Sequence, residues 1–236
     1  MSSILIFGGS RGLGAAFSFG LPAQGDRVWL VSRGEPDLAE RDGVERRWIN
    51  ADLSKSGVAA TVARSVGDEQ LDVVIYNAGI WEHTAFSDAY DFAAVDDAET
   101  ERIIAVNLTS AIACVRALLP NLRRSPAAKV IFIGSTSGLD SSSGREVAYA
   151  ASKFGLRGVT HALRENLRDD GIAVTCLNPG SIGTIRVENG VVSATPHESR
   201  RMIPPQDLVA LVKCVIGLSN ASCVKEIDVM AMTDDA

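Results

Sequence analysis

Short apolar runs alternate with longer amphipathic stretches along this chain, and that alternation most limits what it can fold into. Seven runs have the length and Val/Ile/Leu content of buried strands: Ile4–Phe7, Arg27–Val31, Arg46–Ile49, Leu71–Tyr76, Lys129–Gly134, Ile172–Leu177 and Glu226–Met230. Five segments have helical periodicity: Leu13–Gln24, Lys55–Val66, Ala98–Arg124, Val147–Asp169 and Pro205–Leu218. Nearly continuous apolar strands separated by helices indicate a parallel sheet covered on both faces. The sequence therefore predicts an α/β fold, a doubly wound parallel sheet of about seven strands.

The chain of 236 residues has the size of one large α/β domain. No internal repeat or interior linker divides it, so we expect a single domain over 1–236. Trp81–Asp97 is an acidic connection that we interpret as a solvated surface loop. Gly183–Pro204 follows the sixth strand, on the side where open α/β sheets bind ligands, and is a candidate lid. Pro22 is expected to shorten or bend the first helix.

Charge and the usage of cysteine and histidine argue against several classes of protein. A net charge of −6 and a pI near 5.1 disfavour nucleic-acid binding. The four cysteines lack CxxC pairing and the three histidines lack metal-ligand spacing, so we expect reduced thiols and no metal. No apolar run reaches the roughly 18 residues that a membrane span needs, and the chain enters a strand at once. We expect a cytoplasmic protein without a membrane segment.

A glycine-rich turn follows the first strand. Gly8, Gly12 and Gly14 have GxxxGxG spacing between Phe7 and a predicted helix. Glycine permits positive φ and close approach of backbone amides, while a helix N-terminus offers free N–H groups and positive potential. This context predicts a phosphate-binding turn; the alternative is an ordinary glycine-rich connection, which is common after strands.

Tyr149 and Lys153 are four residues apart in a predicted helix, so both side chains lie on one face. A free tyrosine has a pKa of about 10, and lowering it to near 7 requires roughly 4 kcal/mol. A cation at about 4 Å supplies roughly that energy at an effective dielectric constant near 20. Such a pair also occurs by chance on many helices, so its meaning depends on the glycine turn and on Asn107 upstream.

These motifs together resemble the short-chain dehydrogenase/reductase family over nearly the whole chain. The matching positions occur in the family's order: the glycine turn, Asp52-Leu53, Asn77-Ala78-Gly79, Asn107, Ser135, Tyr149 with Lys153, and Asn178-Pro179-Gly180 through Thr184. Two departures stand out. Phe7 replaces the usual threonine before the turn, and Glu226–Met230 lacks the Gly-Gly that often follows the last strand.

The resemblance implies a Rossmann-type fold and a catalytic tetrad. Tyr149 would exchange a proton with the substrate oxygen, and Ser135 would hydrogen-bond that oxygen. Lys153 would lower the pKa of Tyr149 and bind the nicotinamide ribose, and Asn107 would help to hold a relay water. The implied cofactor site comprises Gly8, Ser10, Arg11, Gly12, Leu13, Gly14, Ser32, Arg33, Asp52, Leu53, Asn77, Ala78, Gly79, Tyr149, Lys153, Pro179, Gly180, Ile182 and Thr184.

The end of the second strand indicates which nicotinamide cofactor is preferred. An NAD enzyme usually carries Asp or Glu there to bind the ribose hydroxyls, but this strand ends Val31-Ser32-Arg33. A guanidinium at Arg33, with Arg11 in the glycine turn, suits the 2′-phosphate of NADP. We expect NADP(H) to be preferred and NAD(H) to remain an alternative, since Glu35 and Asp37 lie nearby and both arginines are also readable as surface charge.

Two residues compete for the role of the hydroxyl that stabilises the substrate oxygen. Counting back thirteen residues from Tyr149, the familiar family spacing, gives Thr136. Aligning the end of the fifth strand gives Ser135. Loops absorb insertions, whereas a one-residue slip in a strand reverses the side-chain faces, so we predict Ser135.

The leading interpretation is an NADP(H)-dependent oxidoreductase that acts on a small-molecule carbonyl or alcohol. A second reading is a redox sensor or regulatory protein that binds NADP(H) with little turnover. A sugar epimerase or dehydratase is disfavoured because the chain is short for the substrate domain of those relatives. Apolar residues on the helices 98–124 and 147–169 also predict a homodimer or homotetramer.

Overall fold

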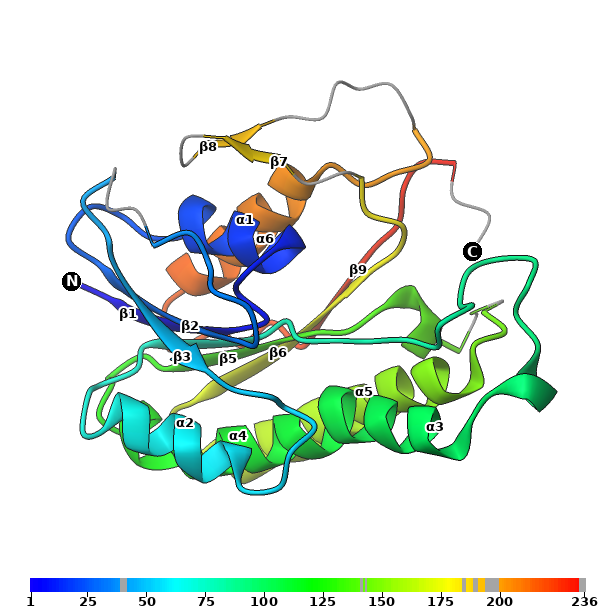
Figure 1. The fold of residues 1–236 in the computed structure, drawn as a ribbon. Coiled ribbons are helices and arrows are strands. Elements are labelled where there is room, and N and C mark those ends of the chain that lie inside the picture. The colour runs from blue at the N-terminus through cyan, green and yellow to red at the C-terminus, as the bar shows by residue number, and fades with distance from the viewer. Residues whose placement is uncertain are drawn as a thin grey trace.

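Seven parallel strands form one sheet in the computed structural model, which describes residues 1–38, 42–140, 142, 144–183, 186–188, 191–193 and 200–233 (Figure 1). The strand order is β3-β2-β1-β4-β5-β6-β9. The strands are β1 (Ser3–Phe7), β2 (Arg27–Ser32), β3 (Glu45–Asn50), β4 (Val73–Tyr76), β5 (Lys129–Ile133), β6 (Ala173–Pro179) and β9 (Glu226–Val229). The predicted doubly wound parallel sheet is thus confirmed.

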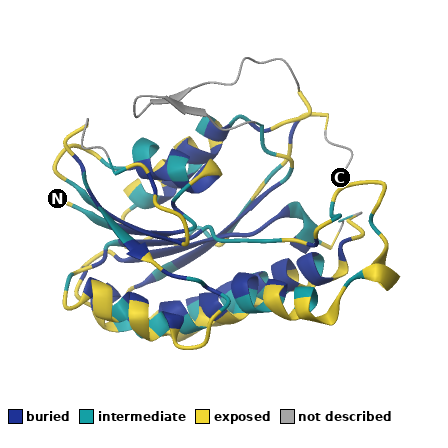
Figure 2. Ribbon diagram, in the orientation of Figure 1, coloured by how far each residue is buried: buried dark blue, intermediate teal, exposed yellow. Residues whose placement is uncertain are grey.

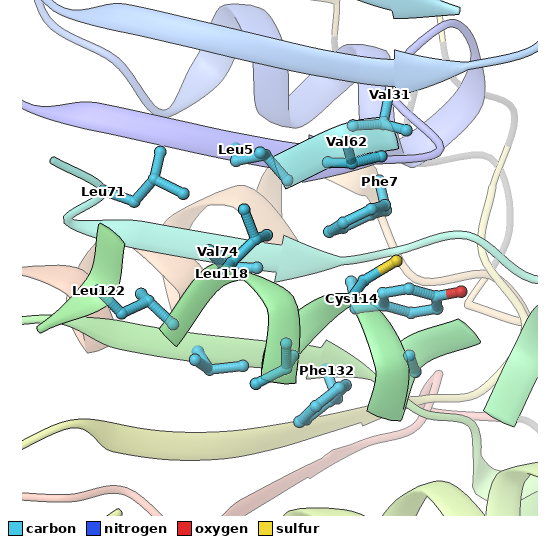
Figure 3. Close-up of a cluster of buried hydrophobic side chains, with 14 of the residues drawn as sticks. Leu5, Phe7, Val31, Val62, Leu71, Val74, Cys114, Leu118, Leu122 and Phe132 are labelled. Atoms are coloured by element: carbon cyan, nitrogen blue, oxygen red, sulfur yellow. The ribbon is translucent and has the colours of Figure 1, made fainter. Parts of the chain in front are cut away.

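Helices cover both faces of the sheet, which explains why the strands are apolar throughout. Helices α1 (Gly12–Gly20) and α6 (Pro205–Gly217) lie on one face, and α2 (Val58–Val66), α4 (Ser110–Leu122) and α5 (Val147–Asn166) lie on the other (Figure 1). Along β1, Ile4 and Ile6 pack toward α1 and α6, while Leu5 and Phe7 pack toward α4. Figure 3 shows the second set, in which Phe7 lies near Val74 and Leu118.

Burial follows the two helical layers (Figure 2), where the inner faces of the helices are buried and the outer faces are exposed. Helix α1 ends at Gly20, two residues before Pro22, so the expected shortening is confirmed. Helix α5 ends at Asn166, before Gly171, which adopts a positive φ of 68°. Both helices are therefore shorter than the periodicity alone predicted.

The long middle helix expected over Ala98–Arg124 has an irregular centre. Helix α3 (Asp97–Ile104) continues through a π-helical segment, η2 (Ala105–Thr109), into α4. The Tyr76 hydroxyl in β4 donates to the carbonyl oxygen of Val106 at 2.6 Å, which fixes this segment against the sheet. Single π-turns inside α-helices are frequent at functional sites, and this one contains Asn107.

One helical stretch among the described residues, Asp97–Leu122, is long and apolar enough by composition to cross a membrane. The expectation that no apolar stretch reaches that length was therefore wrong. In the structure this stretch packs its Cys114, Leu118 and Leu122 side chains into the core beneath the sheet, as Figure 3 shows. Burial in a protein core explains the apolar composition of its inner face.

The candidate lid is described only in part. Strands β7 (Arg186–Glu188) and β8 (Val191–Ser193) pair antiparallel and lie beside α1 (Figure 1). Ile182 forms an isolated bridge with Ile203, which joins the two ends of the segment. Thr184 lies outside the described residues, as do 185, 189–190 and 194–199. A lid over 183–204 stays a prediction.

Apolar side chains remain exposed on the two long helices. Ile112 in α4 is 41% exposed, and Val147 and Phe154 in α5 are 48% and 43% exposed. Pairing of protein copies through these helices would cover them. The homo-oligomer stays a prediction.

The strand order reverses at β1, whose neighbours β2 and β4 leave on opposite sides. Open α/β sheets bind ligands at such a switch point, beyond the carboxyl ends of the strands. Two glycines shape the turn there. Gly8 has a φ of 77°, and a Cβ on Gly14 would lie 2.0 Å from the Gly8 carbonyl oxygen. The turn therefore requires glycine at position 14.

We predict that Gly14→Ala lowers the free energy of unfolding by about 1–3 kcal/mol, the usual range for an overpacked site. Gly158→Ala is the matched control, because a Cβ there meets nothing within 4 Å and φ is not positive. It should raise stability by up to about 1 kcal/mol through helix propensity. Urea unfolding of both variants measures the difference, and equal stability would show that the close approach is not a constraint.

Candidate active site

A cavity of about 390 Å³ opens at the carboxyl ends of the central strands. Most of the residues expected from the sequence line it: Gly8, Ser10, Arg11, Gly12, Leu13, Ser32, Arg33, Asp52, Leu53, Asn77, Ala78, Gly79, Ser135, Tyr149, Lys153, Pro179, Gly180 and Ile182. Asn107 and Gly14 lie behind this surface, and Thr184 is outside the described residues. The topology thus gathers residues from the carboxyl ends of six strands and from helix α5 into one site.

The glycine turn forms one end of the cavity. The Gly8 amide donates to the Val31 carbonyl at 2.8 Å, which closes the turn against β2. A Cβ on Gly8 would lie 3.0 Å from the Ala78 Cα, so the turn and the loop after β4 approach each other closely. Helix α1 begins at Gly12 and presents its N-terminus to the cavity. This end of the cavity can bind an anion through backbone N–H groups and the helix dipole.

Polar groups after β2 and β3 border the same cavity. Ser32 is buried, and its hydroxyl donates to the Gly34 carbonyl at 2.7 Å. Arg33 is exposed beside it. Asp52 accepts hydrogen bonds from the Ser54 amide at 3.0 Å and the Ser54 hydroxyl at 2.8 Å. These bonds, with the positive charges of Arg33 and Lys55, lower the pKa of Asp52 below its usual value.

Asn107 is fully buried and holds the loop after β4 in place. Its Oδ1 accepts from the Ile80 amide at 2.8 Å, and its Nδ2 donates to the Ile80 carbonyl at 2.8 Å and to the Ser152 hydroxyl at 2.9 Å. A Cβ built on Gly79 would lie 3.5 Å from Lys153 Nζ and 3.9 Å from Asn107 Oδ1. Asn107 Oδ1 and Lys153 Nζ therefore both border the backbone at Gly79, and the relay water of Asn107 stays a prediction.

Lys153 is buried on α5 and points to the end of β5. Its Nζ donates to the Ile133 carbonyl at 2.9 Å and lies 5.5 Å from the centre of the Tyr149 ring. Burial disfavours the charged form and lowers the pKa of Lys153 to about 8. The Lys153 side chain therefore loses its proton in the neutral to mildly basic range of pH.

The pKa of Tyr149 differs from the sequence-based expectation. Lys153 was expected to bring it near 7, but burial raises the pKa of Tyr149 above its usual value. A side-chain hydrogen bond with Ser135 lowers the pKa, while the charges of Glu146 and Glu82 raise it further. Desolvation is the largest of these effects. Tyr149 is therefore a phenol, a proton donor, at neutral pH.

The structure distinguishes between the two candidate hydroxyls. Ser135 is 8% exposed, lines the cavity and interacts with Tyr149. Its Oγ also accepts from the Ser137 amide at 3.1 Å, so the side chain has a fixed direction. Thr136 begins the short 3₁₀ helix η3 (Thr136–Gly138) and does not line this cavity.

Sequence reasoning missed the part that residues 81–97 play. The segment was interpreted as a solvated loop, but Glu82 is only 1% exposed. The Trp81 and Phe86 rings lie edge-on to Tyr149, with ring centres 6.3 and 5.5 Å away. The acidic composition concealed this packing, and the aromatic residues among the acids, Trp81, Phe86, Tyr90 and Phe92, are the sequence signal that could have revealed it. Arg102 of α3 also lines the cavity, and no motif in the sequence around it predicted this.

Comparison with known proteins agrees with this architecture. A model of the short chain dehydrogenase family matches residues 2–191, so the chain belongs to that family. It is 33% identical over 187 residues to the rhamnolipids biosynthesis 3-oxoacyl-[acyl-carrier-protein] reductase of Pseudomonas aeruginosa, covering 75% of this chain and 71% of that protein. It is 30% identical over 234 residues to a D-xylose 1-dehydrogenase of Caulobacter vibrioides, covering 89% and 86% of the two chains.

Solved structures are similar over the full length. The Pseudomonas aeruginosa RhlG/NADP active-site complex has a TM-score of 0.79 at 27% identity, with 98% of this chain and 95% of that chain covered. An alcohol dehydrogenase from Thermococcus sibiricus complexed with 5-hydroxy-NADP has a TM-score of 0.82 at 22% identity, covering 100% and 99%, and supports the fold alone. With relatives named as dehydrogenases and reductases, the chain is an oxidoreductase of this family.

We predict that Ser135→Ala lowers kcat/KM for carbonyl reduction by the equivalent of about 2.7–4 kcal/mol, the cost of losing one oxyanion donor. Thr136→Val keeps its shape and lies outside the cavity, so it should change kcat/KM little. Steady-state kinetics on both variants measure the contrast. A larger loss for Thr136→Val would reverse the assignment.

Proposed function

We propose that this chain is an NADP(H)-dependent oxidoreductase that interconverts a carbonyl and an alcohol by hydride transfer, with Tyr149 as general acid and base. The observation that carries the proposal is the single cavity that joins the glycine turn, Arg33 and the pair of Tyr149 and Lys153. A phosphate site and a proton-transfer pair in one cavity are what such a reaction needs.

The residues at the glycine end fit a dinucleotide. The turn leaves no room for a side chain at Gly14, a Cβ on Gly8 would lie only 3.0 Å from Ala78 Cα, and the N-terminus of α1 faces the cavity. Gly8 to Leu13 would hold the pyrophosphate, and Asp52 with Leu53 would contact the adenine. Lys153 would bind the nicotinamide ribose, near Pro179, Gly180 and Ile182. The reduced nicotinamide supplies the hydride when it is bound.

Preference for NADP(H) over NAD(H) rests on the residues after β2. Ser32 stands where an acidic residue would bind the ribose hydroxyls, and its hydroxyl is already bonded to Gly34. Arg33 is exposed at the cavity and can pair with a 2′-phosphate. The RhlG complex contains NADP, and its similarity to this chain supports the same choice.

Tyr149 is suited to donate a proton during reduction. Its pKa is raised by burial, so the phenol keeps its proton at neutral pH and can transfer it to a developing alkoxide. Ser135 would donate a hydrogen bond to the same oxygen. Lys153, whose pKa is about 8, lies beside the phenol and can return a proton to it after each turnover. Alcohol oxidation requires the tyrosinate and is therefore favoured at higher pH.

Aromatic rings border the position that the substrate carbon skeleton would take. Trp81 and Phe86 are 53% and 58% exposed, although both rings contact the Tyr149 ring. Exposed aromatic surface beside a proton donor suits apolar or aromatic substituents on the carbonyl. A panel of ketones, aldehydes and quinones with NADPH identifies the substrate class directly.

Tyr149→Phe removes one oxygen and retains the ring packing against Trp81 and Phe86. We expect turnover to fall roughly 100-fold or more, because general acid catalysis contributes on that scale. NADPH binding, measured by fluorescence titration, should remain within about threefold of the parent protein. Retained carbonyl reduction would contradict the role of Tyr149. NADPH binding without reduction of any carbonyl by the parent would instead favour the redox-sensor reading.

Arg33→Asp tests the cofactor preference. The variant replaces the positive guanidinium by a negative carboxylate, which repels the 2′-phosphate of NADPH. The Kd for NADPH should therefore rise roughly tenfold or more, which is about 1.4 kcal/mol or more. The Kd for NADH should change much less. Arg64→Asp is the control, because Arg64 is an exposed residue of α2 that contacts Thr61. Equal Kd values for NADH and NADPH in the parent protein would refute the preference.

A further inference from the structure

The first turn of α5, which carries Tyr149, is capped by a distant segment of the chain. The Val147 amide donates to the Tyr90 hydroxyl at 3.0 Å. The Ala148 and Tyr149 amides donate to Oε1 of Glu82, at 2.9 and 3.3 Å. Glu146 occupies the usual capping position, yet its side chain makes no capping hydrogen bond. The start of the helix therefore depends on residues from the loop after β4.

Glu146 bonds in the opposite direction. Its Oε1 accepts from the Phe86 amide at 2.9 Å, so each of the two glutamates binds the backbone of the other's segment. Phe86 has a φ of 59°, in the left-handed region that a phenylalanine rarely adopts. The bond to Glu146 helps to hold that conformation, and the Phe86 ring then lies 5.5 Å from the Tyr149 ring.

Both carboxylates are buried. Glu82 is 1% exposed and Glu146 is 5% exposed. Glutamate is seldom buried at this level unless hydrogen bonds and local potential compensate for lost hydration. The N-terminus of a 20-residue helix supplies positive potential to Glu82. Glu82 Oε2 nevertheless has no hydrogen-bond partner among the described residues. Burying a carboxylate oxygen without a partner destabilises the fold, and capping a helix does not require that cost.

We propose that Glu82 and Glu146 are positioning residues for Tyr149: they clasp the loop after β4 to the first turn of α5 and so fix the proton donor in the active site. We call this pair the carboxylate clasp. The Glu82 bond to the Tyr149 amide is the most direct link, because it holds the backbone of the donor itself. Glu146 then holds Phe86, which packs against the donor ring.

The negative charges of the carboxylate clasp also act on Tyr149. Glu146 and Glu82 both raise the pKa of Tyr149, in addition to the effect of burial. Among the residues that the structure describes, the Ser135 hydroxyl also faces the phenol and lowers its pKa, and Lys153 Nζ lies 5.5 Å from the ring centre. A carboxylate near a phenol disfavours the tyrosinate. Removing one of the two negative charges should therefore lower the pKa of Tyr149 and favour the base over the acid.

Three substitutions separate position from charge. Glu82→Gln removes the charge but keeps an oxygen that can accept hydrogen bonds from the Ala148 and Tyr149 amides. Glu82→Ala removes the charge and the hydrogen-bond acceptor. Glu146→Gln removes the second charge and leaves the Glu82 bonds to α5 intact. Glu99→Gln is the matched control, because Glu99 Oε1 bonds the same loop at the His83 amide, at 2.7 Å, from α3. Thermal unfolding of each full-length variant reports whether the fold is retained.

The positioning effect of Glu82 on the first turn of α5 is measured by hydrogen exchange at the Ala148 and Tyr149 amides, an experiment that needs no substrate. Exchange should be slow in the parent, in Glu82→Gln and in Glu99→Gln, and roughly tenfold or more faster in Glu82→Ala as the capping bonds are lost. Unchanged exchange in Glu82→Ala would overturn the positioning role.

The effect of the two glutamate charges on the pKa of Tyr149 is measured by NMR titration of ¹³C-labelled tyrosine. The spectrum is simple because the chain has three tyrosines. The Tyr149 titration should move to lower pH in Glu82→Gln and in Glu146→Gln and stay unchanged in Glu99→Gln. An unchanged Tyr149 titration in both charge-removing variants would overturn the proposal that the clasp acts on the proton donor.

Kinetics provide the final arm, and this arm alone rests on the proposed function. Misplacing Tyr149 in Glu82→Ala should lower kcat by about 10- to 100-fold, with little change in KM for NADPH, and Glu82→Gln should restore most of it. Where the parent reduces a carbonyl, equal kcat in Glu82→Ala and the parent would overturn the clasp. If the parent reduces no carbonyl while the exchange and NMR arms behave as expected, the proposed function fails and the clasp stands.

Discussion

The parallel direction of all seven strands is the constraint on which the site depends. Because every strand runs the same way, the loops after β1, β2, β3, β4, β5 and β6 leave from one edge of the sheet. Residues far apart in the sequence therefore meet there, from Gly8 to Ile182. The reversal of strand order at β1 opens the space for the cavity, and the close approach of Gly8 to Ala78 narrows the end of the cavity that the glycine turn forms.

Burial shifts the pKa values of Tyr149 and Lys153 more strongly than the pairing of the two residues does. Taking each side chain out of water disfavours its charged form, so the pKa of the phenol rises and that of the ammonium falls to about 8. A simple charge-pair argument treats the lysine as a full cation near the phenol and predicts a lowered pKa of Tyr149. The structure adds the desolvation of both groups and two nearby carboxylates, which reverses that direction.

Local patterns predicted the regular elements well and their irregularities poorly. The strands, the GxxxGxG turn and the helix with Tyr149 and Lys153 depend on nearest neighbours, so periodicity found them. The π-helical segment at Asn107 depends on a hydrogen bond from Tyr76 in a different element, and no short-range pattern encodes it. The expected solvated loop at 81–97 was only partly right, because its acids include Glu82, which a distant helix N-terminus buries.

The sequence by itself determined the class of fold, the glycine-rich turn after β1 and the shared helix face of Tyr149 and Lys153, since each depends on the spacing of neighbouring residues. Tertiary structure decided how those residues behave. It brought Ser135 and not Thr136 into the cavity with Tyr149, and it placed Trp81, Phe86 and two buried glutamates around the phenol. The physical reason is that burial and electrostatic energy depend on what surrounds a group in space, and Trp81, Glu82 and Phe86 lie more than fifty residues from Tyr149 in the chain.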